Sequence, residues 1–312
     1  MDTATMERFE ANRSRLASIA YRLLGSAADA EDAVQDAFLR WQAADHGHID
    51  VPEAWLTKVV TNLALDRLRS AKVRRERAVG AWMPEPLLEG DPMLDPAETV
   101  EQRESVTLAV LTLMERLPPV ERAVYVLFEA FSYRHAEIAE ILDITESASQ
   151  QHVHRARRHV AAERTRADVD RVTAHRVVSA FVDAAASGET ERLVALLTDD
   201  AVSVSDGAGG TAAKLMVLTA PEQVANALRI GYKPTSAKRR LVGGAPSLYS
   251  TVLNGSPAMV VALDDRVVAV VVLDLRDGRI ATVRGMANPA RFERLSRIWQ
   301  PSRDGSLVLD SW

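Results

Sequence analysis

Apolar residues recur at helical spacing through the first part of the chain, as far as about Ser70. The apolar positions between Leu16 and Leu24 predict a helix that ends at Gly25, since three- and four-residue spacing puts them on one face. A second apolar face predicts a helix over Ala30–Trp41, and a third helix follows Pro52, from Glu53 to Lys72. The chain therefore begins with a helical domain.

The pattern changes between Trp82 and Glu98, where four prolines and Gly90 interrupt any helix and predict a linker. Helical spacing then returns and predicts four helices: Ala97–Leu117, Pro118–Phe131, Tyr133–Leu142 and Thr145–Glu163. After about Asp168 the pattern changes again, to two helices (His175–Ser187 and Thr190–Leu197) followed by strands. The predicted strands are Ala201–Ser205, Arg239–Val242, Leu248–Leu253, Met259–Leu263, Val267–Leu275 and Ile280–Met286. This order predicts a separate α+β domain.

The two helices on either side of Asp143-Ile144 form a candidate helix-turn-helix. Ala136, Ala139 and Leu142 are predicted to face inward, and Thr145 is placed to cap the second helix. The second helix has polar side chains near its beginning and arginines further along, which suits a helix in the major groove. Its candidate contacts to DNA are Ser147, Gln150, Gln151, His154, Arg155 and Arg158. A helical hairpin with a charged outer face is the alternative.

The net charge of −5 conceals an uneven distribution of charged residues along the chain, and the local clusters bear on DNA binding. Seven Lys/Arg and two acidic residues lie between Lys58 and Arg77, and five Arg, three His and one Glu lie between His152 and Arg166. Glu85–Glu104 holds seven acidic residues and one Arg. Two basic patches could meet phosphates, although solvated helix faces would have the same composition.

Composition excludes several classes of site. The 312 residues are 47% hydrophobic, enough for several cores, and contain no cysteine, so disulfides and thiolate metal sites are excluded. His152, His154 and His159 have no carboxylates at ligand spacing, so we expect no metal and no cofactor. The longest apolar run, Val267–Leu273, is too short to cross a membrane, and a cytoplasmic protein is expected.

Three segments, in this order, resemble the extracytoplasmic-function sigma factors: Asp29–Trp41, Pro52–Arg69 and Leu117–Arg158. The resemblance implies a sigma-two domain that binds core RNA polymerase and melts the −10 element, and a sigma-four domain that reads the −35 element of promoter DNA. The implied polymerase-binding residues are Glu31, Asp32, Gln35, Asp36 and Arg40. The implied −10 DNA-binding residues are Lys58, Asn62, Asp66, Arg67, Arg69, Lys72, Arg74 and Arg75. For Asn62, Asp66 and Arg69, a surface ladder of ion pairs is the alternative.

The stretch from about Asp168 to Trp299 resembles the SnoaL-like, NTF2-like fold, a cone-shaped α+β domain, and three short motifs resemble the SigJ-type subgroup that carries it. The motifs are Trp82–Pro86, Asp206–Gly210 and Asn288–Phe292. The pattern of this subgroup favours Gly where Ala208 stands, a Lys directly after the glycines, and Asp-Lys where Ala290-Arg291 stand. In this chain the nearest Lys after the glycines is Lys214. The implied regulatory contacts between domains are Trp82, Pro84, Glu85, Pro86, Asp206, Gly207, Gly209, Gly210, Asn288, Pro289 and Phe292.

The fold class expected is therefore multidomain, with two all-α domains followed by an α+β domain. The expected divisions are a sigma-two domain at 1–75, an acidic linker at 76–102, a sigma-four domain at 103–166, a SnoaL-like regulatory domain at 168–300 and a tail at 301–312. The third domain is expected to contact the sigma-two domain and the linker. An unidentified small ligand could occupy its cavity.

Two other functions stay open. One is a helix-turn-helix transcriptional regulator with a ligand-sensing domain. The other is an enzyme, because the fold also hosts isomerases and cyclases, but Asp206 is the only attractive general base. We therefore expect no catalytic activity.

Overall fold

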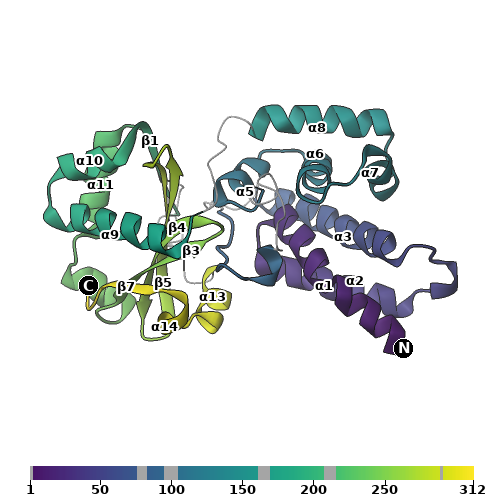
Figure 1. The fold of residues 1–312 in the computed structure, drawn as a ribbon, viewed down its shortest axis with the longest axis horizontal. Coiled ribbons are helices and arrows are strands. Elements are labelled where there is room, and N and C mark those ends of the chain that lie inside the picture. The colour runs from purple at the N-terminus through teal and green to yellow at the C-terminus, as the bar shows by residue number, and fades with distance from the viewer. Residues whose placement is uncertain (1–2, 76–82, 95–104, 161–168, 207–215, 289–290) are drawn as a thin grey trace. The chain divides into compact units, whose positions relative to one another are not determined.

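The computed structural model describes residues 3–75, 83–94, 105–160, 169–206, 216–288 and 291–312, with the side chains of 71–75 left undescribed (Figure 1). The chain divides into two compact units. One contains Met1–Ala78 and Gly90–Arg164, and the other contains Val79–Glu89 and Thr165–Trp312. The predicted linker, 76–102, is thus divided between the units: its described residues 83–89 belong with the C-terminal unit, and those from Gly90 to Leu94 belong with the N-terminal unit.

The N-terminal unit is helical throughout its described residues. Its helices are α1 (Thr3–Leu24), α2 (Ala27–Ala43), α3 (Pro52–Arg75), α5 (Leu108–Met114), α6 (Pro119–Tyr125), α7 (His135–Leu142) and α8 (Glu146–Val160), with short 3₁₀ turns at His46–His48 and Pro92–Leu94. A π-helical turn, Val126–Ala130, continues α6, so the helix predicted to run to Phe131 changes its hydrogen bonding after Tyr125.

The first three helices pack on the faces that their apolar spacing predicts. Ser26 caps α2 by accepting a hydrogen bond from the backbone N–H of Asp29, at 3.2 Å. Trp41 is buried at the end of α2, and its indole N–H donates to the carbonyl of Thr5 on α1 at 3.0 Å. This hydrogen bond satisfies the polar atom of a large buried ring, which fixes the end of α2 against α1.

Helices α7 and α8 form the predicted helix-turn-helix. Asp143 at the turn has a φ of 53°, the left-handed conformation expected of a position that favours glycine. Thr145 caps α8 as predicted, accepting from the N–H of Ala148 at 3.1 Å. The predicted inward face of α7 is wrong in part: Ile138 and Ile141 are buried, whereas Ala136 is exposed. The larger isoleucines bury more apolar area than alanine, so they determine which face packs inward.

At the start of α7, the Glu137 carboxylate accepts hydrogen bonds from the main chain and the side chain of Arg134. The backbone N–H of Arg134 donates to the Glu137 carboxylate at 2.8 Å, and the Arg134 guanidinium lies 3.2 Å from the same group. The side-chain hydrogen bond from Arg134 is the largest cause that lowers the pKa of Glu137.

The C-terminal unit combines helices with one sheet. The helices are α9 (Arg171–Ser187), α10 (Thr190–Leu196), α11 (Pro221–Tyr232), α12 (Ser236–Val242), α13 (Glu293–Ile298) and α14 (Pro301–Asp304). The strands are β1 (Leu197–Ser205), β2 (Met216–Leu218), β3 (Ser247–Leu253), β4 (Ser256–Leu263), β5 (Arg266–Arg276), β6 (Arg279–Met286) and β7 (Ser306–Leu309).

The strands form a sheet in the order β2-β1-β6-β5-β4-β3-β7, in which β1 and β6 are parallel and the other neighbours antiparallel. Helices α9, α10 and α11 lie on one face of this sheet (Figure 1). Phe181 and Val178 of α9 share their apolar core with Met259 of β4 and Val283 of β6. The expected α+β architecture is therefore present.

The strand predicted at Arg239–Val242 is wrong, because these residues end helix α12. Thr235 caps α12 by accepting from the N–H of Lys238 at 3.2 Å, and Gly243 ends the helix with a φ of 93°. Only Leu241 and Val242 are apolar in this segment, and Leu241 is 79% exposed, so no strand face is buried. The sequence pattern also did not predict helix α11 or the short edge strands β2 and β7.

Candidate nucleic-acid interface and linker contacts

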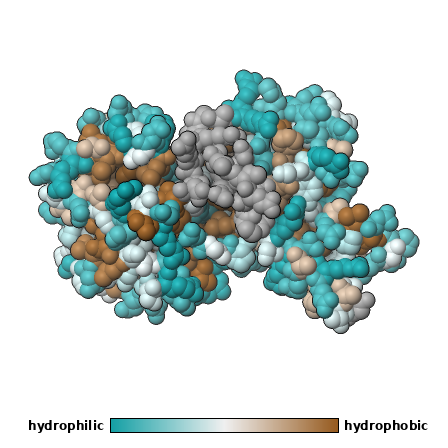
Figure 2. Space-filling view, in the orientation of Figure 1, coloured by the Kyte–Doolittle hydropathy of each residue, from teal (hydrophilic) through white to brown (hydrophobic). Residues whose placement is uncertain are grey.

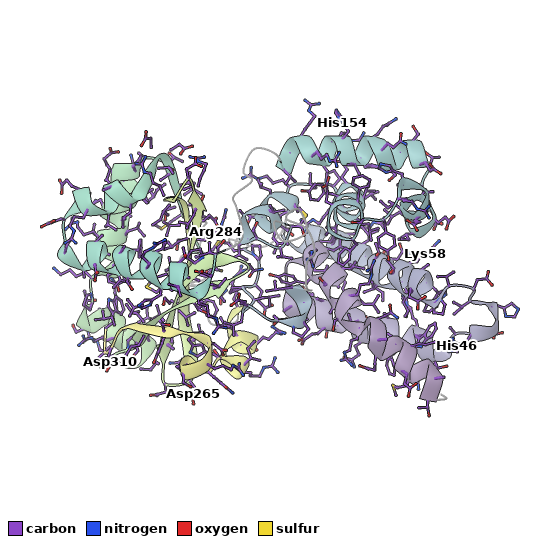
Figure 3. All side chains as sticks on the ribbon, in the orientation of Figure 1. His46, Lys58, His154, Asp265, Arg284 and Asp310 are labelled. Atoms are coloured by element: carbon purple, nitrogen blue, oxygen red, sulfur yellow. The ribbon has the colours of Figure 1, made fainter. Side chains whose placement is uncertain are left out.

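Helix α8 presents a continuous polar stripe. The six residues predicted to contact DNA are all exposed, and their spacing of three or four residues places them on one face: Ser147, Gln150, Gln151, His154, Arg155 and Arg158. The opposite face, with Val153 and Ala156, is buried. Figure 3 shows the labelled His154 pointing away from the body of α8. The helix therefore exposes the face that would enter a major groove.

Neighbouring arginines on α8 differ in what they contact. The Arg155 guanidinium donates to Glu121 of α6 at 2.6 Å, and the Arg157 guanidinium donates to Glu129 at 2.5 Å and lies over the Phe128 ring. These pairs hold α8 against α6 and the π-helical turn. Arg158 lies between Arg157 and the end of the helix and is exposed.

The acidic residues of α2 lie at the surface, where the sequence predicted a polymerase contact. Glu31, Asp32, Gln35 and Arg40 are exposed, and Asp36 is half-buried. Arg67 of α3 donates to Asp36 at 2.6 Å and lies 3.7 Å from Asp32. Arg67, predicted to contact −10 DNA, thus neutralises part of the acidic face, a pairing that spacing along the sequence could not reveal.

The middle of α3 holds the three residues for which the sequence left open either contact with DNA bases or a surface ladder of ion pairs. Asn62 is half-buried, while Asp66 and Arg69 are exposed and form an ion pair of 3.2 Å. The side chains of the predicted rim residues Lys72, Arg74 and Arg75 lie outside the description. The alternative of a surface ion pair is therefore realised for Asp66 and Arg69.

Lys58, another predicted −10 contact, faces the helix-turn-helix within the same unit. Its ammonium donates to the Glu140 carbonyl at 2.8 Å and to the Asp143 carboxylate at 3.0 Å. The hydroxyl of the preceding residue, Thr57, lies 3.0 Å from the Tyr133 hydroxyl. The described residues thus place the beginning of α3 against α7 and the turn before α8.

The linker contacts the C-terminal unit through main-chain hydrogen bonds. The Leu87 N–H donates to the Asn254 side-chain oxygen at 2.8 Å, and the Asn254 N–H donates to the Leu87 carbonyl at 3.0 Å. Leu88 forms an antiparallel bridge with Leu253, and the Glu89 N–H donates to the Val252 carbonyl at 3.3 Å. Residues 87–89 therefore pair with the end of β3.

Asn254 was missed by sequence reasoning, although a signal exists for it. Asn254-Gly255 lies between two apolar runs, and both residues have positive φ, at 49° and 77°. This dipeptide is the strongest short-range hairpin signal, since both central residues of the favoured turn need positive φ. Its second role, as a linker contact, has no local sequence signature.

The three short motifs meet around Asp206. The buried Asp206 carboxylate accepts from the backbone N–H groups of Ala287 and Asn288, at 3.0 and 3.3 Å, and lies 3.9 Å from the Arg291 guanidinium. Arg291 in turn donates to the Met83 carbonyl of the linker. A positively charged residue therefore connects the buried carboxylate with the linker, although Arg291 was not singled out beforehand.

The structure places the other predicted regulatory residues as follows. Pro84, Pro86 and Phe292 are buried, Glu85 and Asn288 are half-buried, and Trp82, Gly207, Gly209, Gly210 and Pro289 lie outside the described residues.

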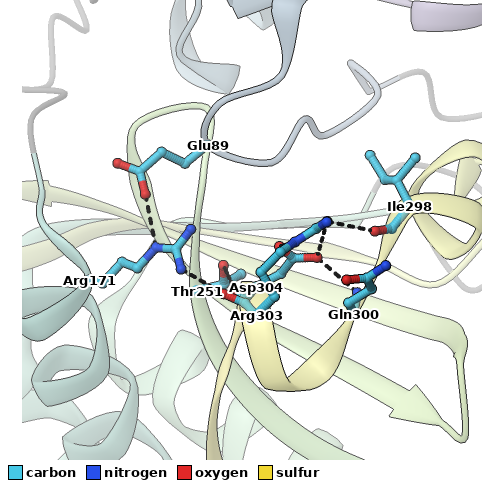
Figure 4. Close-up of polar contacts among 7 residues, drawn as sticks. All are labelled: Glu89, Arg171, Thr251, Ile298, Gln300, Arg303 and Asp304. Carbon is cyan, nitrogen blue, oxygen red and sulfur yellow. Dashed lines mark hydrogen bonds and ion pairs between the residues drawn. The ribbon is translucent and has the colours of Figure 1, made fainter.

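Glu89 of the linker has a further polar contact, drawn in Figure 4. Arg171 of α9 pairs with Glu89 at 3.1 Å and also donates to the Arg303 carbonyl at 2.7 Å. Thr251 of β3 donates to the Asp304 carbonyl at 2.5 Å. Arg171 of α9 therefore contacts both the linker, at Glu89, and α14, at Arg303.

Candidate catalytic and metal-binding groups are few. The buried Asp206 carboxylate accepts from two backbone N–H groups, and His175 is half-buried with its Nδ1 2.8 Å from the Ser250 hydroxyl. Among the residues that the structure describes, no group of three His, Asp or Glu could hold a metal ion. No described helix is long and apolar enough to span a membrane.

The family comparisons agree with this arrangement. The model of sigma-70 region 2 matches residues 8–74, and the model of sigma-70 region 4 matches residues 107–160. The chain is 37% identical over 294 residues to the ECF RNA polymerase sigma factor SigJ of Mycobacterium tuberculosis, covering 92% of this chain and 93% of SigJ. It is 32% identical to the probable ECF RNA polymerase sigma factor SigI of the same species, covering 92% and 94%.

A solved structure extends the likeness to the fold of both units. The crystal structure of Mycobacterium tuberculosis SigJ aligns with a TM-score of 0.68 and 31% identity, covering 92% of this chain and 98% of that chain. These matches agree with the polar stripe that α8 exposes in the helix-turn-helix. This chain therefore belongs to the extracytoplasmic-function RNA polymerase sigma factors.

Proposed function

We propose that this chain binds core RNA polymerase, recognises the −35 and −10 promoter elements and promotes DNA melting for transcription initiation. The observation that carries the proposal is the exposed stripe on α8, in the same chain as an exposed acidic face on α2. Gln150 and Gln151 suit adenine edges, and Arg158 suits a backbone phosphate. Glu31 and its neighbours offer carboxylates to a basic surface of polymerase.

The domain assignments follow from this proposal. Residues 1–75 would bind polymerase and open the −10 element, residues 76–102 would link the helical domains, and residues 103–166 would read the −35 element. Residues 168–300 would form the regulatory domain, and its sheet also includes β7 from the segment 301–312 that the sequence predicted to be a tail. Holding splayed bases needs polar pockets with a basic rim, which α3 would supply through Asn62, Lys72, Arg74 and Arg75.

The contact between α3 and the helix-turn-helix has a consequence for this function. Elements near −35 and −10 are about 25 base pairs apart, which is roughly 85 Å of duplex at about 3.4 Å per base pair. Lys58 and Asp143 are 3.0 Å apart. A chain in this arrangement could not read both elements, so the two helical domains must separate when the factor engages polymerase and promoter.

The linker contacts support a regulatory role for the C-terminal domain. Leu87, Leu88 and Glu89 pair with β3, and Arg291 joins the linker to Asp206. A domain that holds the linker limits how far the two DNA-reading domains can spread. We assign this domain no catalytic role, because the carboxylate of Asp206 is occupied by two backbone N–H groups.

A helix-turn-helix regulator with a ligand-sensing domain is the alternative, and binding to polymerase separates the two. The full chain should form a complex with core RNA polymerase in the absence of DNA. Glu31→Lys should weaken that complex about tenfold, because it places like charges together. The matched charge reversal Glu222→Lys, at an exposed position of α11, should leave it unchanged. Absence of any complex would favour the regulator.

A further inference from the structure

The C-terminal unit encloses a cavity of about 800 Å³ between α11, α12 and the helix-covered face of the sheet. Its wall is mainly aliphatic and aromatic, with Phe181, Leu228, Met259, Val261, Val271 and Val283 among its residues. A volume of this size holds a drug-sized molecule, and a wall of this chemistry favours an apolar one. Figure 2 shows apolar surface on this unit.

The rim of the cavity includes unusually exposed apolar side chains. Met216 of β2 is 57% exposed and Leu241 of α12 is 79% exposed, and both line the cavity. Large exposed apolar residues beside a cavity mark a site that apolar molecules can enter without crossing a charged barrier.

One polar atom in the wall lacks a partner. Tyr232 of α11 is 8% exposed, and its hydroxyl oxygen makes no hydrogen bond within the part of the chain that the structure describes. Its ring centroid lies 6.3 Å from that of Phe181 and 6.0 Å from that of Trp312, and all three residues line the cavity. Burying a hydroxyl without a hydrogen-bond partner costs free energy, so a ligand that supplies this partner gains binding affinity.

The charged residues of the wall are already engaged or exposed. The Lys238 ammonium donates to three backbone carbonyls, those of Ile230, Gly231 and Lys233. Arg266 is exposed and donates to the Val242 carbonyl at 2.8 Å. Glu293, which also lines the cavity, is exposed. A carboxylate inside the cavity would therefore find no buried cation to compensate its desolvation.

Burial is the main cause that raises the pKa of Tyr232, and the charge of Asp183 adds to it. The phenol therefore stays neutral at physiological pH and acts as a hydrogen-bond donor rather than as a general base.

We propose that this cavity binds an uncharged, apolar small molecule through one oxygen that accepts a hydrogen bond from the Tyr232 hydroxyl. The site is a binding site and not a catalytic one, since its wall offers one neutral phenol and no buried base among the described residues. The proposal concerns the C-terminal unit alone and does not depend on the sigma activity of the chain.

The test uses the purified full chain and the uncharged fluorescent probe 1-aminoanthracene. The probe should bind at one site per chain and should be displaced by 2-decanone, which has one carbonyl acceptor. Decanoate, with the same chain length and a negative charge, should displace it at least tenfold less well, because its charge would lie uncompensated in the cavity. No saturable probe binding, or equal displacement by decanoate, overturns the proposal.

Variants locate the site and test the hydrogen bond. Tyr232→Phe should weaken 2-decanone about fivefold, as the loss of one neutral hydrogen bond does. Tyr249→Phe, which removes a phenol outside the cavity, should not weaken it. Ala269→Leu should weaken the probe and 2-decanone together, because the added side chain occupies the cavity. Unchanged 2-decanone affinity in Tyr232→Phe, with the thermal unfolding of the full chain also unchanged, rejects the proposed oxygen contact.

Discussion

Two adjacent arginines at the end of α8 have different surroundings, and the difference separates DNA contact from structural support. Arg157 pairs with Glu129 at 2.5 Å and covers the Phe128 ring, so it stabilises the packing of α8. Arg158 lies on the exposed stripe with Gln151 and His154. Periodicity alone predicted this stripe correctly, because three- and four-residue spacing fixes which side chains share a face.

This difference predicts distinct effects of two alanine substitutions on promoter binding by the polymerase complex. Arg158→Ala should reduce the slope of log K against log salt by about 1, because one phosphate contact is lost. Arg157→Ala should leave the slope unchanged, although it loosens the packing of α8. The measurement is fluorescence anisotropy with labelled promoter DNA across a salt series. Equal slopes in both variants would contradict the assignment of Arg158.

Other residues could not be assigned from sequence, since their partners lie far along the chain. Arg67 lies in a basic segment, but its guanidinium contacts Asp36, which is 31 residues away. Arg291 stands where the family pattern has Lys, and its contact with the Met83 carbonyl spans 208 residues. Pairs of this kind depend on the tertiary fold, which local charge and spacing do not encode.

At the scale of elements, the β3–β4 hairpin does more than connect two strands. Its turn residue Asn254 holds the linker through the Leu87 N–H, at 2.8 Å, and residues 88 and 89 continue the pairing along β3. The strand pattern of β3 to β6 was predicted from alternation and apolar runs. The two edge strands of the sheet were not predicted. β2 has three residues and β7 has four, and such short segments show no periodicity.

Asn254→Gly tests this linker contact without disturbing the turn, because glycine also accepts a positive φ. The variant lacks the side-chain oxygen that accepts from Leu87. We expect faster hydrogen exchange of the Leu87 amide, measured by NMR or by mass spectrometry of a peptide spanning residues 83–94. Exchange in β5 should stay as in the unchanged chain and serves as the internal control. Equal exchange at Leu87 would show that Asn254 does not hold the linker.

At the scale of the whole molecule, the account requires the two helical domains to exist in more than one arrangement. In the structure Lys58 contacts the turn before α8, and exposed ion pairs of this kind stabilise an arrangement by only about 0.2–1 kcal/mol. Other contacts join the same two domains, such as the buried hydrogen bond from Arg122 of α6 to the Leu23 carbonyl of α1 at 2.6 Å, so binding of polymerase and promoter must supply more than that free energy. The sequence predicted both helical domains, but a contact between them cannot be seen in the periodicity of either.

The absence of cysteine from the chain allows this requirement to be tested cleanly. A Lys58→Cys, Asp143→Cys double variant would carry the only two thiols, which a bismaleimide with an internal disulfide can join. We expect the joined protein to bind polymerase but to initiate poorly, and reduction of the linker should restore the activity of the unjoined variant. Full initiation by the joined protein would show that these domains need not separate.

The central claim is that this chain directs core RNA polymerase to promoters, and in vitro transcription from a promoter library tests it most directly. The account predicts RNA only when the full chain is added to core polymerase. It also predicts loss of that RNA when Gln150, Gln151 and Arg158 are replaced together by alanine in a chain that still binds polymerase. Absence of RNA from every promoter, with the same polymerase active under another sigma factor, would contradict the account.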